Sequence, residues 1–146
     1  MDATLPQGWP GTGLPIRLPI EHFSPPGAFQ VDETSDTLLT GYPATDIVMF
    51  TLNIPQNQVL RITGIGWDAD DEGGMAGLRW TGYANNVPVP GLVNQIAGLG
   101  TVDNPVAMNA KIPGSSTFTV KGSSSISLYS WTYTVRVVGY LFTAKT

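Results

Sequence analysis

The chain has 146 residues, a net charge of −4, 12% charged residues and no cysteine. Its length suits one domain, and the absence of cysteine excludes disulfides and cysteine-zinc sites. Its seven Lys and Arg residues are scattered, and no apolar stretch reaches about 18 residues, so the sequence predicts neither nucleic-acid binding nor a membrane span.

Residues 1–30 predict an extended N-terminal arm. Proline fixes φ and removes a backbone donor, so the arm cannot form a helix or join the middle of a sheet. Its prolines are Pro6, Pro10, Pro15, Pro19, Pro25 and Pro26. A free disordered tail does not need its large apolar side chains, which are Leu5, Trp9, Leu14, Ile16, Leu18, Ile20, Phe23 and Phe29. We therefore expect the arm to lie on another polypeptide.

The charged fraction of 12% is about half of the usual ~25%. Subunit interfaces are depleted in charge at their centres. The deficit favours a surface covered by further copies of the chain or by partners. The alternative is a β-domain whose surface is built from Ser, Thr, Asn and Gly.

Residues 31–143 predict alternating β-strands, and Phe29–Glu33 is counted as a short first strand. The alternation in Asp46–Ile54 places Val48, Phe50, Leu52 and Ile54 on the inward face. After a turn at Pro55–Asn57, the segment Gln58–Trp67 predicts a strand. Its alternation puts Val59, Ile65 and Trp67 on one face and Leu60 and Ile62 on the other.

The next segments alternate between strands and turns. We expect a loop over Asp68–Gly74, a strand at Leu78–Tyr83 and a turn at Asn85–Asn86. Val87–Gly91 holds too much proline for a central strand, and Leu92–Ile96 predicts a short edge strand. Val106–Ile112, a tight turn at Pro113–Gly114 and a strand with Phe118 and Val120 inward follow.

The final segment, Ile126–Phe142, changes its apolar parity between Leu128 and Trp131. A bulge near Tyr129–Ser130, or a bend where the chain changes sheets, would reconcile the two halves. Together the segments predict an all-β fold: an antiparallel, jelly-roll-like β-sandwich of about eight strands, preceded by the proline-rich arm. The arm, 1–30, and the sandwich, 31–146, are the two expected parts.

The acidic cluster at Asp68–Glu72 is the first candidate for chemistry, because carboxylates near a glycine suit Ca²⁺. An EF-hand requires Glu at the twelfth loop position, which holds Arg79. A simpler calcium loop stays open as an alternative, and a solvated loop that blocks edge pairing is the favoured interpretation.

No enzyme signature is present. His22 is the single histidine, and no Gly-x-Ser-x-Gly elbow occurs. We predict no catalytic residue, no metal site and no cofactor. Hydrolysis by a pair of carboxylates stays open, since any two acids can meet in space.

The aromatic residues Trp67, Trp80, Trp131, Tyr129, Tyr133 and Tyr140 occupy strand positions. Core packing is favoured over a sugar-stacking platform for them. Trp9 lies in the arm and is the first candidate for an intermolecular anchor, because Trp is enriched at interface hot spots. The expected partner-binding residues are Trp9, Leu14, Ile16, Ile20 and Phe23.

Four segments resemble the jelly-roll capsid decoration, or cement, proteins of tailed bacteriophages. They are residues 53–68, 86–91 and 100–105 and the ending Tyr133–Phe142. The resemblance implies a homotrimer on the outer capsid surface of the virion, made in the host cytoplasm, whose arms contact the major capsid protein. It carries no catalytic residues over to this chain.

The expected function is therefore a non-enzymatic structural protein that stabilises a phage shell by bridging capsid subunits. One alternative is a receptor-binding or carbohydrate-binding module of a phage fibre or baseplate. It would need exposed aromatic side chains beside the acidic loop. A glycan hydrolase is a third, weaker alternative.

Overall fold

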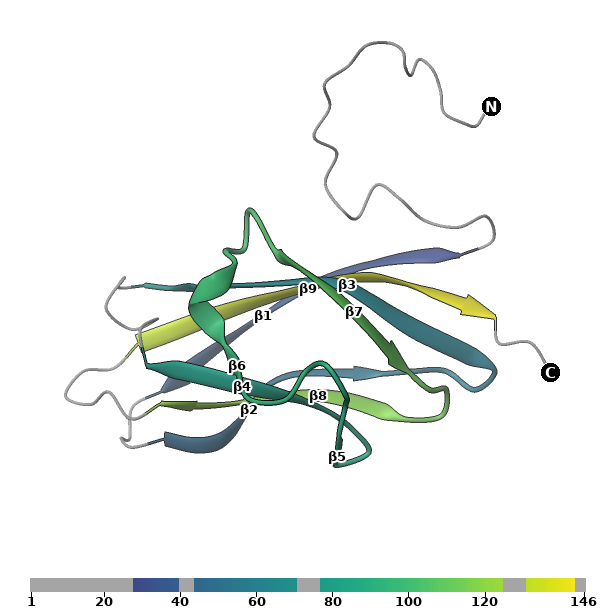
Figure 1. Ribbon diagram of the computed structural model, residues 1–146, viewed down its shortest axis with the longest axis horizontal. Helices are drawn as coiled ribbons and strands as arrows, with labels where there is room; N and C mark the ends of the chain where they lie inside the picture. Colours follow the sequence, from purple (N-terminus) through teal and green to yellow (C-terminus); the bar gives the residue numbers. More distant parts are fainter. Residues whose placement is uncertain (1–27, 40–43, 71–76, 125–130, 144–146) are drawn as a thin grey trace, which may run out of the picture.

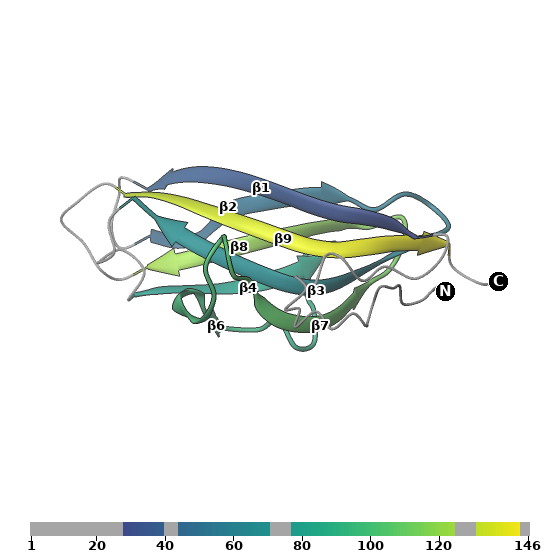
Figure 2. The same ribbon diagram turned by 90° about the horizontal axis from the view of Figure 1, so that it is seen from above.

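The computed structural model describes residues 28–39, 44–70, 77–124 and 131–143. Two antiparallel sheets lie face to face in this part of the chain (Figures 1 and 2). None of the described segments forms a helix with the length and apolarity needed to cross a membrane. The all-β sandwich predicted from the alternation is confirmed.

The first sheet has the strand order β1-β9-β3-β7. Its strands are β1 (Phe29–Leu39), β9 (Trp131–Thr143), β3 (Gln58–Ala69) and β7 (Val106–Ile112). The second sheet has the order β2-β8-β4-β5, with β6 also paired to β4. Its strands are β2 (Ala44–Asn53), β8 (Thr117–Ser124), β4 (Leu78–Ala84), β5 (Val87–Pro88) and β6 (Gln95–Ile96).

The connections give the jelly-roll arrangement. The chain passes from one sheet to the other between most consecutive strands, from β1 to β2, then to β3 and β4. Both β5 and β6 pair with β4, whose other side is taken by β8, so they act as one interrupted edge strand. When β5 and β6 are counted as one strand, the sandwich has about eight strand positions, as expected of a jelly roll.

Two predicted turns are confirmed. Asn85 and Asn86 join β4 to β5 with positive φ values of 49° and 67°. Positive φ at both central residues is the type I′ geometry that matches strand twist, and Asn tolerates it. The Pro113–Gly114 turn joins β7 to β8.

A β-bulge corrects the predicted inward face of β2. The pairing register with β8 shifts between Val48 and Phe50, so Met49 and Phe50 are both buried. Val48 points outward and is 51% exposed, which makes its predicted inward position wrong. An extra residue in one strand inverts the alternation beyond it.

A second bulge corrects β3. Its register shifts against both β7 and β9 between Ile62 and Gly64. Leu60 and Ile62 before the shift and Ile65 and Trp67 after it are therefore all buried. The prediction that these pairs occupy opposite faces is wrong, because it assumed a regular strand.

Two strand ends also differ from the sequence-based expectation. β1 runs to Leu39 rather than Glu33, because β9 pairs with its whole length. β3 continues through Asp68 and Ala69, where a loop was expected, since β9 offers Thr134 and Tyr133 as partners. Neither extension shows a regular alternation of polar and apolar residues, so the sequence did not indicate that the strands continue there.

Side chains from both sheets fill the core. Phe50 and Phe118 meet edge to face with ring centroids 6.2 Å apart, and Trp67 lies 6.1 Å from Trp80. The predicted core positions of the described aromatic residues are confirmed for Trp67, Trp80, Trp131 and Tyr133, which are buried. Tyr140 is half-buried and lies beside Phe142.

Candidate interaction surface

The edge of the second sheet beside β4 is the surface with the most distinctive chemistry. We call residues 87–99 the uncharged edge: β5, the loop after it, β6 and the short 3-10 helix η3 (Ala97–Leu99). No charged residue lies between Arg79 and Asp103, the longest charge-free stretch of the chain. Sheet edges normally carry charge to prevent unwanted pairing, so this composition calls for a physical account.

Buried anchors fix this edge on the sandwich. Val89, Leu92 and Ala97 are 4%, 0% and 1% exposed. Gly82 of β4 donates its N–H to the Leu92 carbonyl at 2.8 Å and accepts from the Val89 N–H at 2.9 Å. A Cβ on Gly82 would lie 2.9 Å from Leu92 Cδ1, so the absence of a side chain makes room for Leu92.

A turn at Asn94 is held by polar side chains of β4. Arg79 Nε donates to Asn94 Oδ1 at 2.8 Å, and Arg79 Nη2 donates to the Asn94 carbonyl at 3.1 Å. The Asn94 N–H donates to Thr81 Oγ1 at 2.9 Å. Asn94 has a positive φ of 52°, which Asn accepts more readily than most residues. The loop is therefore tied at its tip as well as by its anchors.

Apolar side chains point outward from this fixed backbone. Val87, Val93, Ile96 and Leu99 are 65%, 49%, 46% and 62% exposed. They make up four of the seven large exposed hydrophobic residues in the described part of the chain. The edge thus presents an ordered apolar surface whose own residues carry no charge.

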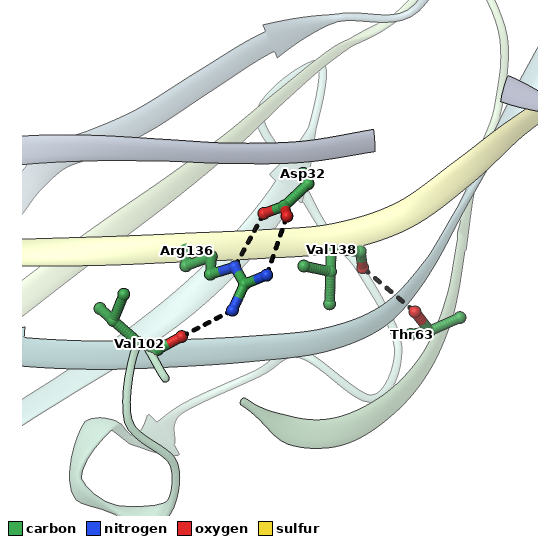
Figure 3. A network of polar contacts seen from close by, with 5 residues as sticks. All are labelled: Asp32, Thr63, Val102, Arg136 and Val138. Atoms are coloured by element: carbon green, nitrogen blue, oxygen red, sulfur yellow. Dashed lines mark hydrogen bonds and ion pairs between the residues drawn. The ribbon is translucent and has the colours of Figure 1, made fainter. Parts of the chain in front are cut away.

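A polar network fixes the connection from η3 to β7. Figure 3 shows the Arg136 guanidinium between the Asp32 carboxylate and the Val102 carbonyl. Arg136 Nε and Nη2 donate to the two Asp32 oxygens at 2.8 Å each, and Nη1 donates to the Val102 carbonyl at 2.9 Å. The Val102 N–H faces Asp68 Oδ1 at 3.4 Å. One arginine therefore links β1, β9 and this loop.

The electrostatics of Asp32 follow from that geometry. The hydrogen bonds from Arg136 lower the pKa of Asp32 below its ordinary value, and the guanidinium charge acts in the same direction. Partial burial raises the pKa and opposes both effects. A bidentate Arg–carboxylate pair fixes orientation as well as charge, so its role here is to position the loop.

Close backbone contact completes the attachment of this loop. The Trp67 N–H donates to the Gly100 carbonyl at 3.0 Å. A Cβ on Gly66 would collide with the Thr101 carbonyl oxygen. Beneath the loop, Thr63 Oγ1 of β3 donates to the Val138 carbonyl of the neighbouring strand β9 at 3.4 Å, which links the two strands and not the loop (Figure 3). The backbone of the η3–β7 connection therefore lies directly on the sheet.

A hollow of about 270 Å³ lies where β2 and β4 begin and β8 ends. Its lining residues are Ala44, Thr45, Gly77, Arg79, Asn94, Ser123 and Ser124. They offer hydroxyl, amide and guanidinium donors, which suit an anionic or hydroxylated ligand. This lining contains no carboxylate or imidazole, so it supplies no acid–base pair for hydrolysis.

The partner-binding residues predicted from the sequence, Trp9, Leu14, Ile16, Ile20 and Phe23, lie outside the described residues. The same holds for His22, for Tyr129–Ser130 and for Asp71 and Glu72 of the acidic cluster. Asp68 and Asp70 are described, and no cluster of three or more His, Cys, Asp or Glu residues suited to a metal ion occurs in the described ranges.

Sequence reasoning missed the uncharged edge. The prolines of Val87–Gly91 and the weak alternation of Leu92–Ile96 predict a peripheral position for both segments, and the structure confirms it. The signal that marks the surface is the missing charge from residue 80 to 102, which is visible in the sequence. Which of its apolar residues point outward is not.

Comparison with known proteins returns no match to a protein-family model, to a curated protein or to a solved structure.

Proposed function

We propose that this chain is a non-enzymatic virion protein that decorates and stabilises a bacteriophage capsid by bridging major capsid subunits. The observation that carries the proposal is that the strands fill the sandwich core with their own side chains. Leu60, Ile62, Ile65, Ile112, Phe118, Val120 and Val137 are fully buried between the sheets. A filled core offers the apolar residues of the arm no place inside the sandwich.

The arm would therefore contact another polypeptide. Holding about 26 residues in one conformation costs roughly 1 kcal/mol each at the low end, less where proline has stiffened the chain. Offsetting ~20 kcal/mol at about 25 cal/mol per Å² requires roughly 800 Å² of apolar burial. A capsid lattice offers such an area on neighbouring subunits. Trp9, Leu14, Ile16, Ile20 and Phe23 would make the contact.

Bridging would stabilise the shell by mass action. A protein that binds the assembled shell and not its separated subunits shifts the equilibrium toward assembly. Several linked contacts per oligomer would raise the avidity beyond that of one arm. The sequence resemblance to decoration proteins is consistent with this role.

Sedimentation with empty phage heads tests the proposal. We expect the full chain to cosediment with heads assembled without it and to raise their melting temperature. Deleting residues 1–26 should abolish both effects and leave the sandwich folded, as circular dichroism would verify. Trp9→Ala should weaken binding, with Thr12→Ala as a matched arm control. Heads bound equally well by the deletion variant would contradict the role of the arm.

A receptor-binding or carbohydrate-binding module of a phage fibre or baseplate is the second candidate. Its support is the hollow, whose lining includes the polar side chains of Arg79, Thr45 and Ser123. Against it, Trp67, Trp80 and Trp131 are buried and offer no stacking surface for sugars. A glycan array separates the candidates: binding that Arg79→Ala abolishes would favour the module, and no binding would favour the structural role.

A further inference from the structure

We infer that the uncharged edge, residues 87–99, is the surface through which copies of this chain associate. The inference rests on the proposed function only for the expectation that the chain forms an oligomer. It identifies the part of the surface through which that oligomer would form. Charge, exposure and backbone order at one edge of the sandwich support this assignment.

Charge selects this edge for contact between identical chains. The chain has a net charge of −4, so two copies repel each other wherever their acidic surfaces meet. Residues 87–99 carry no charged side chain of their own. The Arg79 guanidinium, which contacts them, is hydrogen-bonded to Asn94, and its charge is opposite in sign to the net charge of the chain. An uncharged surface can meet its own copy without like-charge repulsion, whereas recognition of a differently charged partner would need complementary charges.

The side chains have the composition of an interface centre. Val87, Val93, Ile96 and Leu99 are exposed along the edge, and on one side they border the polar outer face of β4, which includes Arg79. Thr81 and Tyr83 of β4 and Lys121 of β8 belong to that face, where the Lys121 ammonium lies 5.1 Å from the centroid of the Tyr83 ring. An apolar centre within a polar rim is the usual anatomy of a protein interface.

Backbone order favours packing of side chains over addition of a strand. β5 and β6 are two residues long each, and the anchored loop between them contains Pro90 and the Asn94 turn. Pro88 also lacks a donor, so a partner strand cannot form a continuous ladder here. The anchors Val89 and Leu92 hold the backbone in place before any partner arrives, which lowers the ordering cost of association.

Two valines with nearly equal exposure provide a matched test. Val93 on the uncharged edge is 49% exposed, and Val48 on β2 is 51% exposed. Figure 2 shows β2 along the opposite long edge from β6. Val93→Asp and Val48→Asp add the same charge at solvent-exposed sites, so both variants should fold.

Sedimentation velocity of the full chain over a range of micromolar concentrations gives the readout. We expect the wild type and Val48→Asp to sediment as the same oligomer. Val93→Asp should raise the dissociation constant at least roughly 100-fold, as burying an unpaired carboxylate at an interface centre requires. A monomeric wild type, an unchanged Val93→Asp oligomer, or equal dissociation of both variants would overturn the inference.

The head-binding assay separates this inference from the proposed function. If Val93→Asp dissociates while no form of the protein binds heads, the interface stands and the decoration role fails. If the Val93→Asp oligomer persists while deletion of residues 1–26 abolishes head binding, the decoration role stands and the interface assignment fails. The deletion variant should keep the wild-type oligomer, because the uncharged edge lies outside the arm.

Discussion

The two long edges of the sandwich are built in opposite ways. In the described residues, β1 is an edge strand of eleven residues that pairs with β9 alone, and it carries Asp32, Glu33 and Asp36. The uncharged edge has two strands of two residues each, anchored loops and exposed apolar side chains. Charge protects an open, regular strand from pairing with another chain.

The difference shows that an edge can be protected by charge or by irregularity, with different consequences. Charge on a regular edge strand opposes the addition of another strand, even though β1 also exposes Phe29 and Leu38. An irregular edge excludes only strand addition, so its apolar side chains stay available for packing against another molecule. This contrast is the physical basis for assigning association to one edge and not to the other.

Removing the main anchor of the uncharged edge should have the largest effect. Leu92→Ala deletes a fully buried side chain, so we expect a loss of about 2–5 kcal/mol in the free energy of unfolding. Leu99→Ala, at a 62% exposed position, should change it by less than about 0.5 kcal/mol. Urea unfolding at low protein concentration measures both. Similar losses would mean that the edge is not anchored as described.

A smaller and pH-dependent effect is expected at Asp32. Asp32→Asn removes the ion pair with Arg136. Because the Asp32 carboxylate is partly exposed, we expect the free energy of unfolding to fall by about 0.5–1 kcal/mol at neutral pH. Because the pKa of Asp32 is lower in the folded than in the unfolded state, the pair stabilises the fold above the unfolded-state pKa. That contribution is lost as the pH falls through the folded-state pKa.

Unfolding measured from neutral to acid pH checks this sign. The difference between wild type and Asp32→Asn should shrink toward zero as the pH falls. Asp103→Asn, at an exposed loop position, serves as the control. A difference that grows on acidification would contradict the assigned role of Arg136.

The smallest effect on stability is expected from the charged residues of the edge strand β1. Glu33→Val removes one charge from the open strand and should alter the free energy of unfolding by no more than about 0.5 kcal/mol. It should, however, increase slow self-association, because a regular edge strand with fewer charges pairs more readily with another chain. Dynamic light scattering during storage detects this, with Glu33→Asp as the control. Equal self-association of the two variants would contradict the idea that charge protects this edge.

Much of the fold was predictable because alternation is a local property of the sequence. In β9, Trp131, Tyr133, Val135 and Val137 are buried in strict alternation. The turns at Asn85–Asn86 and Pro113–Gly114 follow from backbone preferences of single residues. The bulges could not be predicted in the same way. A register shift depends on the partner strand and has no reliable signature in the sequence of the strand that carries it.

The candidate surface divides in the same way. The sequence by itself determined the all-β class, the peripheral position of residues 87–96 and the absence of charge around them, because these depend on composition and short-range periodicity. Only the tertiary structure decided that Leu92 points inward and Val93 outward, and that Arg136 reaches Val102 across the sheet. Those outcomes depend on contacts between residues far apart in the chain, which the order of residues does not display.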